Sequence, residues 1–178
     1  MCHYYFFGCC TYIVNLSFKK LKPNATVPTQ GSEYAAGYDL YACIDEPIAI
    51  QPHETVKIGT GIAITPPKVS CSVPWNNYSN TQKIIDTGIN TFGAIFARSG
   101  LATKKGLRPA NCVGVCDVDY TGEYIVPLHN DSNVRQVIEP NERIAQLVFI
   151  PYITDTWQEV SELKETQRGN GGFGSSGK

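Results

Sequence analysis

The residues whose types and spacing suit chemistry lie mostly in the C-terminal half of the chain. One group is the stretch VGVCDVDYTGE, where Asp117 and Asp119 precede Tyr120. A carboxylate in such a position can take a proton from an attacking water and act as a general base. The same D-x-D-Y-x-G pattern is also typical of a tight β-turn, and taken alone it favours the turn.

The second group is the glycine-rich tail that follows Gln167, RGNGGFGSSGK. Closely spaced glycines let consecutive backbone N–H groups converge on an anion, and Arg168 and Ser175 add donors. Phe173 lies among them, in a place suited to stacking on a nucleobase. The G-x-G-x-x-G match that starts at Gly169 is not a dinucleotide fingerprint, because no helix can follow it. The tail predicts an arm that closes over a nucleotide, with a frayed terminus as the alternative.

Short β-rich runs, separated by Gly, Pro, Asn and Asp, must position these residues. No window holds a long amphipathic period of 3.6 residues, although residues 101–106 and 157–166 each favour a short helical turn. Strands of this length and spacing predict an all-β sandwich or barrel. The expected strands are Tyr38–Cys43, Thr55–Ile64, Phe92–Ala97, Cys112–Cys116, Glu123–His129 and Ala145–Ile150.

Composition limits the classes of function. At 178 residues, with 15 Lys plus Arg against 16 Asp plus Glu, the chain fits one domain without a net field toward nucleic acid or an anionic membrane. Seven cysteines without a C-x-x-C pair match neither a zinc site nor a disulfide framework, so we expect reduced thiols and a cytoplasmic, intracellular protein. The apolar opening from Cys2 to Val14 has no basic residue ahead of it and is shorter than a membrane span, so it predicts neither a secretory signal nor an anchor.

The chain divides into four parts. Residues 1–18 are an extension of unclear role, either an added β segment or a disordered one. Residues 19–166 form the expected β domain, which residues 68–90 interrupt as an inserted surface loop or hairpin. Residues 167–178 are the flexible, glycine-rich arm, whose order must come from a ligand or a neighbouring chain.

Five segments occur in an order that resembles the trimeric dUTPase family. They are AGYDLYA (36–42), ARSGLA (97–102), NCVGVCDVDYTGE (111–123), NERIAQLVF (141–149) and RGNGGFGSSG (168–177). The resemblance implies a jelly-roll-like β-barrel or sandwich, a homotrimer that exchanges its C-terminal arm between subunits, and Mg²⁺ as cofactor. It also implies dUTP as the substrate, hydrolysed to dUMP and pyrophosphate by in-line attack of water on the α-phosphate. That activity limits uracil incorporation into DNA and supplies dUMP for dTMP synthesis.

The same resemblance implies roles for the residues of the third motif. Asp117 matches the general base that orients and deprotonates the attacking water. Tyr120 is similar to the tyrosine that packs on the deoxyribose and leaves no room for a 2′-hydroxyl. Asn111 and the backbone near Val115 and Cys116 match the slot that binds the uracil edge and rejects thymine and cytosine.

The other motifs supply the phosphate and metal contacts that the resemblance implies. Arg98, Ser99 and Gly100 look like a phosphate-binding turn. Gln146 resembles a further phosphate contact, with a satisfied polar residue on a strand as the alternative. Asp39 corresponds to a carboxylate that meets Mg²⁺ through water, with a turn carboxylate as the alternative.

The tail residues complete the set of roles. By the resemblance, Arg168 acts as a finger on the γ-phosphate and Phe173 covers the uracil. Gly174 and Ser175 close over the phosphates, which expels water and completes the charge cage.

Three positions depart from the family pattern, and two other readings stay open. Ala97 stands where Pro is common, Thr121 stands where Arg is common, and Pro127 lies in a strand-like run, which predicts an edge strand or a bulge.

A dCTP deaminase shares the fold, but its catalytic glutamate falls where this chain has Pro127. A non-catalytic protein of the same fold, gripping a partner through residues 1–18 or 68–90, is the third reading.

Overall fold

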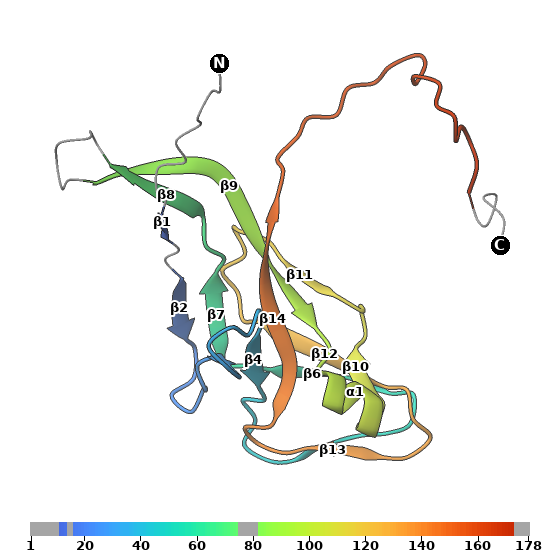
Figure 1. The fold of residues 1–178 in the computed structure, drawn as a ribbon. Helices are drawn as coiled ribbons and strands as arrows, with labels where there is room; N and C mark the ends of the chain where they lie inside the picture. Colours follow the sequence, from blue (N-terminus) through green and yellow to red (C-terminus); the bar gives the residue numbers. More distant parts are fainter. Residues whose placement is uncertain (1–10, 14–15, 75–81, 173–178) are drawn as a thin grey trace.

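The computed structural model describes residues 11–13, 16–74 and 82–172. They form a β-rich body with one short helix, α1 (Ser99–Lys105), and a long C-terminal segment that runs away from the body (Figure 1). The predicted all-β class is therefore confirmed, and the short helix falls where residues 101–106 favour one. Within these ranges, no helix is long and apolar enough to cross a membrane.

One large antiparallel sheet holds strands that are distant in sequence. Its strands, in spatial order, are β1 (Thr11–Ile13), β8 (Val69–Pro74), β9 (Gln82–Phe96), β14 (Arg143–Tyr152), β4 (Tyr38–Tyr41) and β3 (Thr29–Gln30), with β11 (Gly114–Cys116) also paired to β9. Since β14 lies between β9 and β4, residues from three distant motifs meet across it. This crossing order agrees with the jelly-roll-like topology that the sequence predicts.

Three smaller antiparallel sheets complete the body. They are β10 (Leu107–Pro109), β12 (Ile125–Asn130) and β6 (Thr55–Gly59); β13 (Gln136–Ile138) with β5 (Ile48–Ile50); and β2 (Ser17–Lys20) with β7 (Ile62–Thr65). Alternate residues of β12 are buried, as the period of two in a half-buried strand requires. Its Val126 and Leu128 join Leu40, Ile58 and Leu147 in one apolar core.

The run expected as one strand from Thr55 to Ile64 is two strands, β6 and β7, joined by a turn at Thr60 and Gly61. Gly61 has φ +67°, a left-handed conformation that glycine adopts without strain. A Cβ at this position would lie 2.7 Å from the Sγ of Cys43. Glycine therefore permits both the turn and the close approach of Cys43, and the alternation of the local sequence does not predict either.

The 68–90 segment, expected as an inserted loop or a hairpin, contains a hairpin. Strand β8 pairs antiparallel with the first part of β9, and β1 adds to the far side of β8. The hairpin thus extends the large sheet away from the core instead of forming a separate unit (Figure 1).

Two local expectations prove wrong. Strand β12 is not an edge strand, because it lies between β10 and β6. Pro127 is tolerated there because β10 ends opposite Leu128, so the missing N–H faces the end of β10. Residues 157–166 form no helical turn. They are exposed along their whole length, and a short helix without a packed face is marginal in water.

Candidate active site

A pocket of about 190 Å³, here called the hairpin pocket, lies between β9, β11 and the loop of residues 117–123. Sequence reasoning selected five of the residues that line it: Asn111, Val115, Cys116, Asp117 and Tyr120. The structure therefore brings the whole third motif to one cavity.

A tight turn before β11 shapes one wall of the hairpin pocket. Cys112 has φ +61°, and its N–H donates to the carbonyl of Pro109 at 3.1 Å. Strand β11 then pairs with β9, with Gly114 opposite Ile95. A Cβ at Gly114 would lie 3.1 Å from the Cβ of Ile95, so glycine lets the two strands approach closely. This wall contains the backbone groups near Val115 and Cys116 that the sequence analysis predicts to hydrogen-bond the edge of the base.

The loop of residues 117–123 forms the opposite wall. The N–H of Tyr120 donates to the carbonyl oxygen of Asp117 at 3.1 Å, which closes the turn that the D-x-D-Y-x-G pattern predicts. Only the backbone of Asp117 takes part in this turn. Its side chain is exposed and makes no hydrogen bond or ion pair with the described residues. Turn chemistry and a reactive carboxylate are therefore compatible at the same residue.

Tyr120 is fixed against its own loop. Its hydroxyl donates to the carbonyl of Glu123 at 2.8 Å. A Cβ at Gly122 would lie 2.6 Å from the Tyr120 hydroxyl oxygen, so the absence of a side chain there lets the ring fold back. The ring is still 42% exposed, which leaves one face free to contact a ligand.

Sequence reasoning missed Glu123 and Tyr124, which also line the hairpin pocket. The carboxylate of Glu123 accepts the N–H of Gly61 at 2.7 Å, which ties the loop to the β6–β7 turn. Tyr124, which directly precedes β12, is fully buried. The alternation of β12 was the available signal for its burial, but nothing local indicates that it lies beneath a pocket.

The cysteines near the pocket differ in exposure. Cys116 is buried, and burial raises the pKa of its thiol. Cys43 is also buried with a raised pKa from the same cause, whereas Cys112 is exposed. All three are free thiols, as the sequence predicts for the described part of the chain.

A second group of predicted residues meets around Asp39 on β4. The Asp39 carboxylate is 5% exposed and accepts the Nε of Arg98 at 2.8 Å and the Nη1 of Arg143 at 3.2 Å. We call these three residues the arginine cluster. Arg143 was not selected from the sequence, because its partner lies about a hundred positions away and only the pairing of β4 with β14 brings them together. The buried carboxylate orients two guanidinium groups that suit phosphate oxygens.

The remaining predicted phosphate contacts lie near the arginine cluster. Gln146 is exposed on β14 and stands opposite Asp39 on one side and Phe96 on the other. Ser99 and Gly100 are exposed in the first turn of α1, directly after Arg98. None of these residues lines the hairpin pocket of the same chain.

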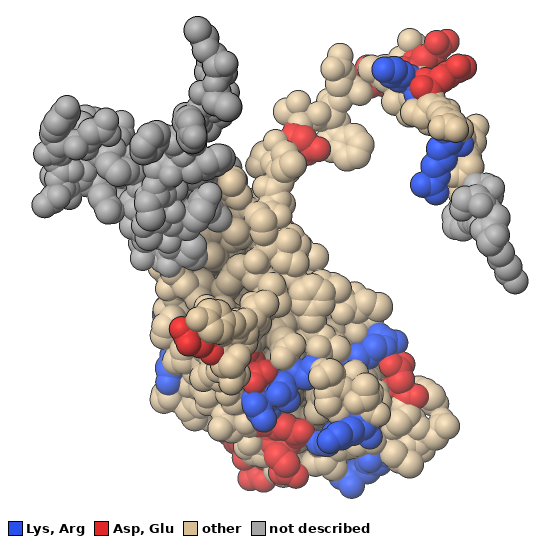
Figure 2. All heavy atoms as spheres, in the orientation of Figure 1, with Lys and Arg blue, Asp and Glu red and all other residues tan. Residues whose placement is uncertain are grey.

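The described part of the tail, up to Gly172, lies in neither group within one chain. Arg168 is exposed, and its Nε donates to the carbonyl of Gly171 at 2.9 Å. Phe173, Gly174 and Ser175 lie outside the described residues. The segment before them is exposed and stands clear of the body, with Trp157 fully exposed (Figure 2).

The acidic and other metal-binding side chains of the described residues bear on the Mg²⁺ that the family resemblance implies. No group of three or more His, Cys, Asp or Glu side chains suited to an ion occurs in the described ranges. Both oxygens of Asp39 already accept from arginines, which leaves only their remaining lone pairs for a water. This set fits an ion that arrives on phosphate oxygens and keeps most of its water, not a resident ion in an all-protein cage.

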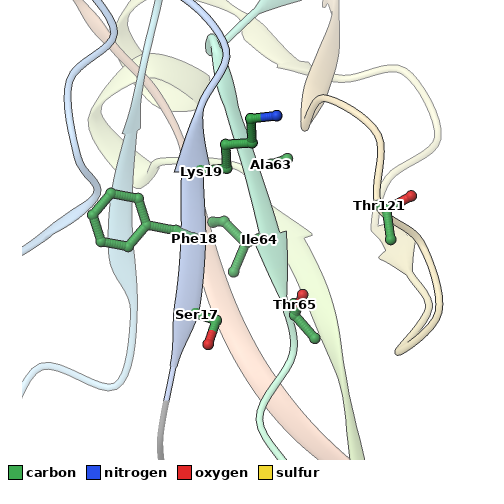
Figure 3. A pocket seen from close by; sticks show the side chains of 7 residues that line it. All are labelled: Ser17, Phe18, Lys19, Ala63, Ile64, Thr65 and Thr121. Carbon is green, nitrogen blue, oxygen red and sulfur yellow. The ribbon is translucent and has the colours of Figure 1, made fainter.

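A second cavity of about 240 Å³, the side groove, lies beyond the loop of the hairpin pocket. Strands β2 and β7 form its floor, and Thr121 stands across from them (Figure 3). Lys19 is its one charged lining residue, and no carboxylate or histidine accompanies it. The side groove therefore lacks the groups for hydrolysis.

The fold is all-β, one pocket opens on a carboxylate without a partner among the described residues, and a separate buried carboxylate orients two arginines that suit an anion; this combination is typical of a nucleotide-binding hydrolase. The sequence model of the dUTPase family matches residues 76–177, more than half of the chain. The chain belongs to the dUTPase family.

Curated relatives agree over most of the length. The deoxyuridine 5′-triphosphate nucleotidohydrolase of Idiomarina loihiensis is 41% identical over 152 residues, which cover 85% of this chain and 87% of the relative. The enzyme of the same name from Desulfitobacterium hafniense is 38% identical over 164 residues, which cover 92% of this chain and 95% of the relative. Both names describe hydrolases and not deaminases.

Solved structures show the same fold. A dUTPase variant of phage 80α superposes with a TM-score of 0.71 at 25% identity, over 91% of this chain and 98% of that one. Another variant of that phage enzyme, solved with dUpNHpp, gives a TM-score of 0.67 at 26% identity, over 92% and 98% of the two chains.

Proposed function

We propose that this chain hydrolyses dUTP to dUMP and pyrophosphate, with Asp117 as the general base. The observation that carries the proposal is the placement of an unpaired Asp117 carboxylate in the same pocket as Asn111 and Tyr120. The relatives named as deoxyuridine 5′-triphosphate nucleotidohydrolases support the same reaction.

The reaction requires an aligned water, a proton acceptor, and positive charge where the leaving group gathers negative charge. Asp117 takes a proton as the water oxygen attacks the α-phosphorus in line. The bond from the α-phosphorus to the bridging oxygen then breaks, and pyrophosphate leaves with the electron pair. Mg²⁺ supplies charge neutralisation on the phosphates when it is bound. Arg98 and Gln146, with Ser99 and Gly100, bind the phosphate oxygens from the protein side.

Selectivity comes from the walls of the hairpin pocket. Asn111 and the backbone near Val115 and Cys116 hydrogen-bond the uracil edge, and a wall made of backbone leaves no space for a 5-methyl group. The exposed face of Tyr120 packs on the deoxyribose and excludes a 2′-hydroxyl.

We further propose that one complete site takes residues from several copies of the chain in a homotrimer. The phosphate-binding residues near Asp39 do not line the hairpin pocket of their own chain, and the segment with Trp157 packs on nothing in it. A neighbouring copy that supplies these groups completes the site, with Arg168, Phe173, Gly174 and Ser175 closing over the nucleotide. Asp39 then meets the hydrated Mg²⁺ through water.

The test is pyrophosphate release from dUTP, compared with dTTP, dCTP and UTP in Mg²⁺, by the parent protein and by Asp117→Asn. We expect the parent to prefer dUTP, and the variant to lose at least roughly a hundredfold in kcat because its amide accepts no proton. A mass determination in solution on both proteins checks that the trimer persists. A variant with parental turnover, or a parent that is monomeric, contradicts the proposal.

A further inference from the structure

Tyr124 holds a buried hydroxyl that the packing of the chain does not explain. The residue is 0% exposed, and its hydroxyl has no hydrogen-bond partner within the described part of the chain. The Cys116 thiol is nearby but does not meet the geometric criteria for a hydrogen bond with this hydroxyl. After burial, its proximity is the next cause of the raised pKa of Tyr124, and the Tyr124 hydroxyl in turn lowers the pKa of Cys116, which burial raises. Since buried polar groups are nearly always paired, a phenylalanine would fill the same space at lower cost.

The strand across from Tyr124 makes room for this hydroxyl. Gly93 on β9 has no side chain, and a Cβ built there would lie 3.0 Å from the Tyr124 hydroxyl oxygen, 3.1 Å from the Cδ1 of Leu147 and 3.4 Å from the Cβ of Cys116. Gly93 also pairs directly with Cys116, which lines the hairpin pocket. The Tyr124 side chain therefore packs on the face of the β9–β11 pair, over Gly93 and beside Cys116.

The ring of Tyr124 also reaches the opposite wall. Its centroid lies 6.1 Å from that of the Tyr120 ring, at an interplanar angle of 34°. Its backbone is fixed independently, because its N–H donates to the carbonyl of Ile62 at 2.8 Å and its carbonyl accepts the hydroxyl of Thr60 at 2.7 Å. Tyr124 therefore lies against both walls of the hairpin pocket: Cys116 on the β11 wall, which is assigned to the base, and Tyr120 on the loop wall, which is assigned to the sugar.

We propose that Tyr124 is a positioning residue for substrate discrimination, which holds the Tyr120 ring and the Cys116 wall at the separation that admits a deoxyribose and excludes a ribose. This inference rests on the proposed function, since it names what sets the selectivity of the same site. Tyr124 lies at the bottom of the hairpin pocket, beneath the exposed ring of Tyr120, and has no solvent-exposed surface of its own. Its effect passes through Tyr120 and Cys116.

The test measures kcat/KM for dUTP and for UTP in the full-length oligomer, and compares their ratio between variants. Tyr124→Leu removes the aromatic ring that packs against Tyr120. We expect the ratio of kcat/KM for dUTP to kcat/KM for UTP to fall roughly three- to tenfold, which corresponds to the free energy of one aromatic contact. Tyr124→Phe keeps the ring and should keep the ratio, with an unfolding midpoint at or above the parental one. A merely structural role would lower both rates together and leave the ratio unchanged.

A second pair of variants does not require Tyr124→Leu to fold. Gly93→Ala places a methyl group against the Tyr124 hydroxyl and should lower the same ratio. Adding Tyr124→Phe removes the oxygen that the methyl meets, so the double variant should recover the ratio. An unchanged ratio in both Tyr124→Leu and Gly93→Ala overturns the inference, and so does a double variant of parental stability in which the ratio does not recover.

The controls separate this inference from the function on which it rests. A parent protein that cleaves dUTP no faster than UTP contradicts the proposed function. A parent that discriminates normally, beside variants that discriminate equally well, contradicts only the role of Tyr124.

Discussion

Two arginines share the carboxylate of Asp39, and this single side chain therefore fixes the direction of two cations. Asp39 has little contact with water, whereas Arg98 is partly exposed and Arg143 is about half exposed. Solvent weakens the pairs, but the buried carboxylate would leave two guanidinium groups without a counter-charge if it were removed.

Replacing Asp39 by Asn tests this arrangement. We expect the free energy of unfolding to fall by about 1–3 kcal/mol, because one buried acceptor loses its charge while both arginines remain. The KM for dUTP should rise, since the arginines lose their fixed orientation. Urea denaturation and steady-state kinetics measure the two effects, with the exposed Glu33→Gln as a matched charge control. Parental stability in the Asn variant would show that the pairs contribute nothing.

At the scale of elements, the turn between β6 and β7 is hydrogen-bonded to the end of the loop of residues 117–123 and to Tyr124, which follows it. Gly61 donates its N–H to Glu123, and Thr60 donates its hydroxyl to the carbonyl of Tyr124. The loop that carries Asp117 is therefore anchored to a strand turn far away in sequence. This anchoring limits the motion of the hairpin pocket before any ligand binds.

Replacing Gly61 by Ala should destabilise the protein. The residue has φ +67°, and a Cβ would approach the Sγ of Cys43 at 2.7 Å and the Cβ of Ala25 at 2.8 Å. We expect a loss of about 2–4 kcal/mol in unfolding free energy, from backbone strain and overpacking together. Gly31→Ala is the control, because a Cβ there meets nothing within 4 Å. Equal denaturation midpoints for the two variants would contradict the prediction.

The C-terminal arm is the other element with a testable role. Deleting residues 167–178 removes Arg168 and the glycine-rich closure but keeps the segment around Trp157 that packs on no part of its own chain. We expect kcat for dUTP to fall roughly a hundredfold, the loss typical of removing transition-state donors, while the trimer persists. Single-turnover rates and sedimentation measure both. Unchanged turnover in the truncated protein would remove the arm from the mechanism.

At the scale of the whole molecule, charge and protonation affect the stability of the body. On the face shown in Figure 2, acidic and basic side chains are interspersed over the body and along the tail. The balanced formal charge of −1 gives no large field of either sign. Buried groups with raised pKa values, such as Cys116 and Tyr124, contribute to the dependence of stability on alkaline pH.

Burial raises the pKa of Cys116 from its ordinary value of 9.0 and the pKa of Tyr124 from its ordinary value of 10.0. Above these values the unfolded chain releases protons that the folded chain retains, so the free energy of unfolding falls as pH rises through 9 and 10. Below pH 9 these groups are protonated in both states and contribute no slope. Urea midpoints at a series of pH values measure the fall, which should be shallower in Tyr124→Phe. An identical slope in that variant would contradict the assignment.

The sequence by itself determined the family, the all-β class and the grouping of the third-motif residues that line the hairpin pocket. The turn from Asp117 to Tyr120 was predictable because its hydrogen bond joins residues three positions apart. The hairpin wall with Asn111 and Cys116 was likewise predictable, since all its residues lie within one short motif.

Only the tertiary structure decided which residues distant in sequence meet. Arg143 meets Asp39 through the register of β14 on β4, β9 pairs Gly93 with Cys116, and Gly93 leaves room for the Tyr124 hydroxyl. The break at Gly61 falls where local alternation predicted one continuous strand, and glycine there permits the close approach of Cys43. The physical reason is that a strand pattern fixes which face of a residue is buried, but not which strand lies beside it.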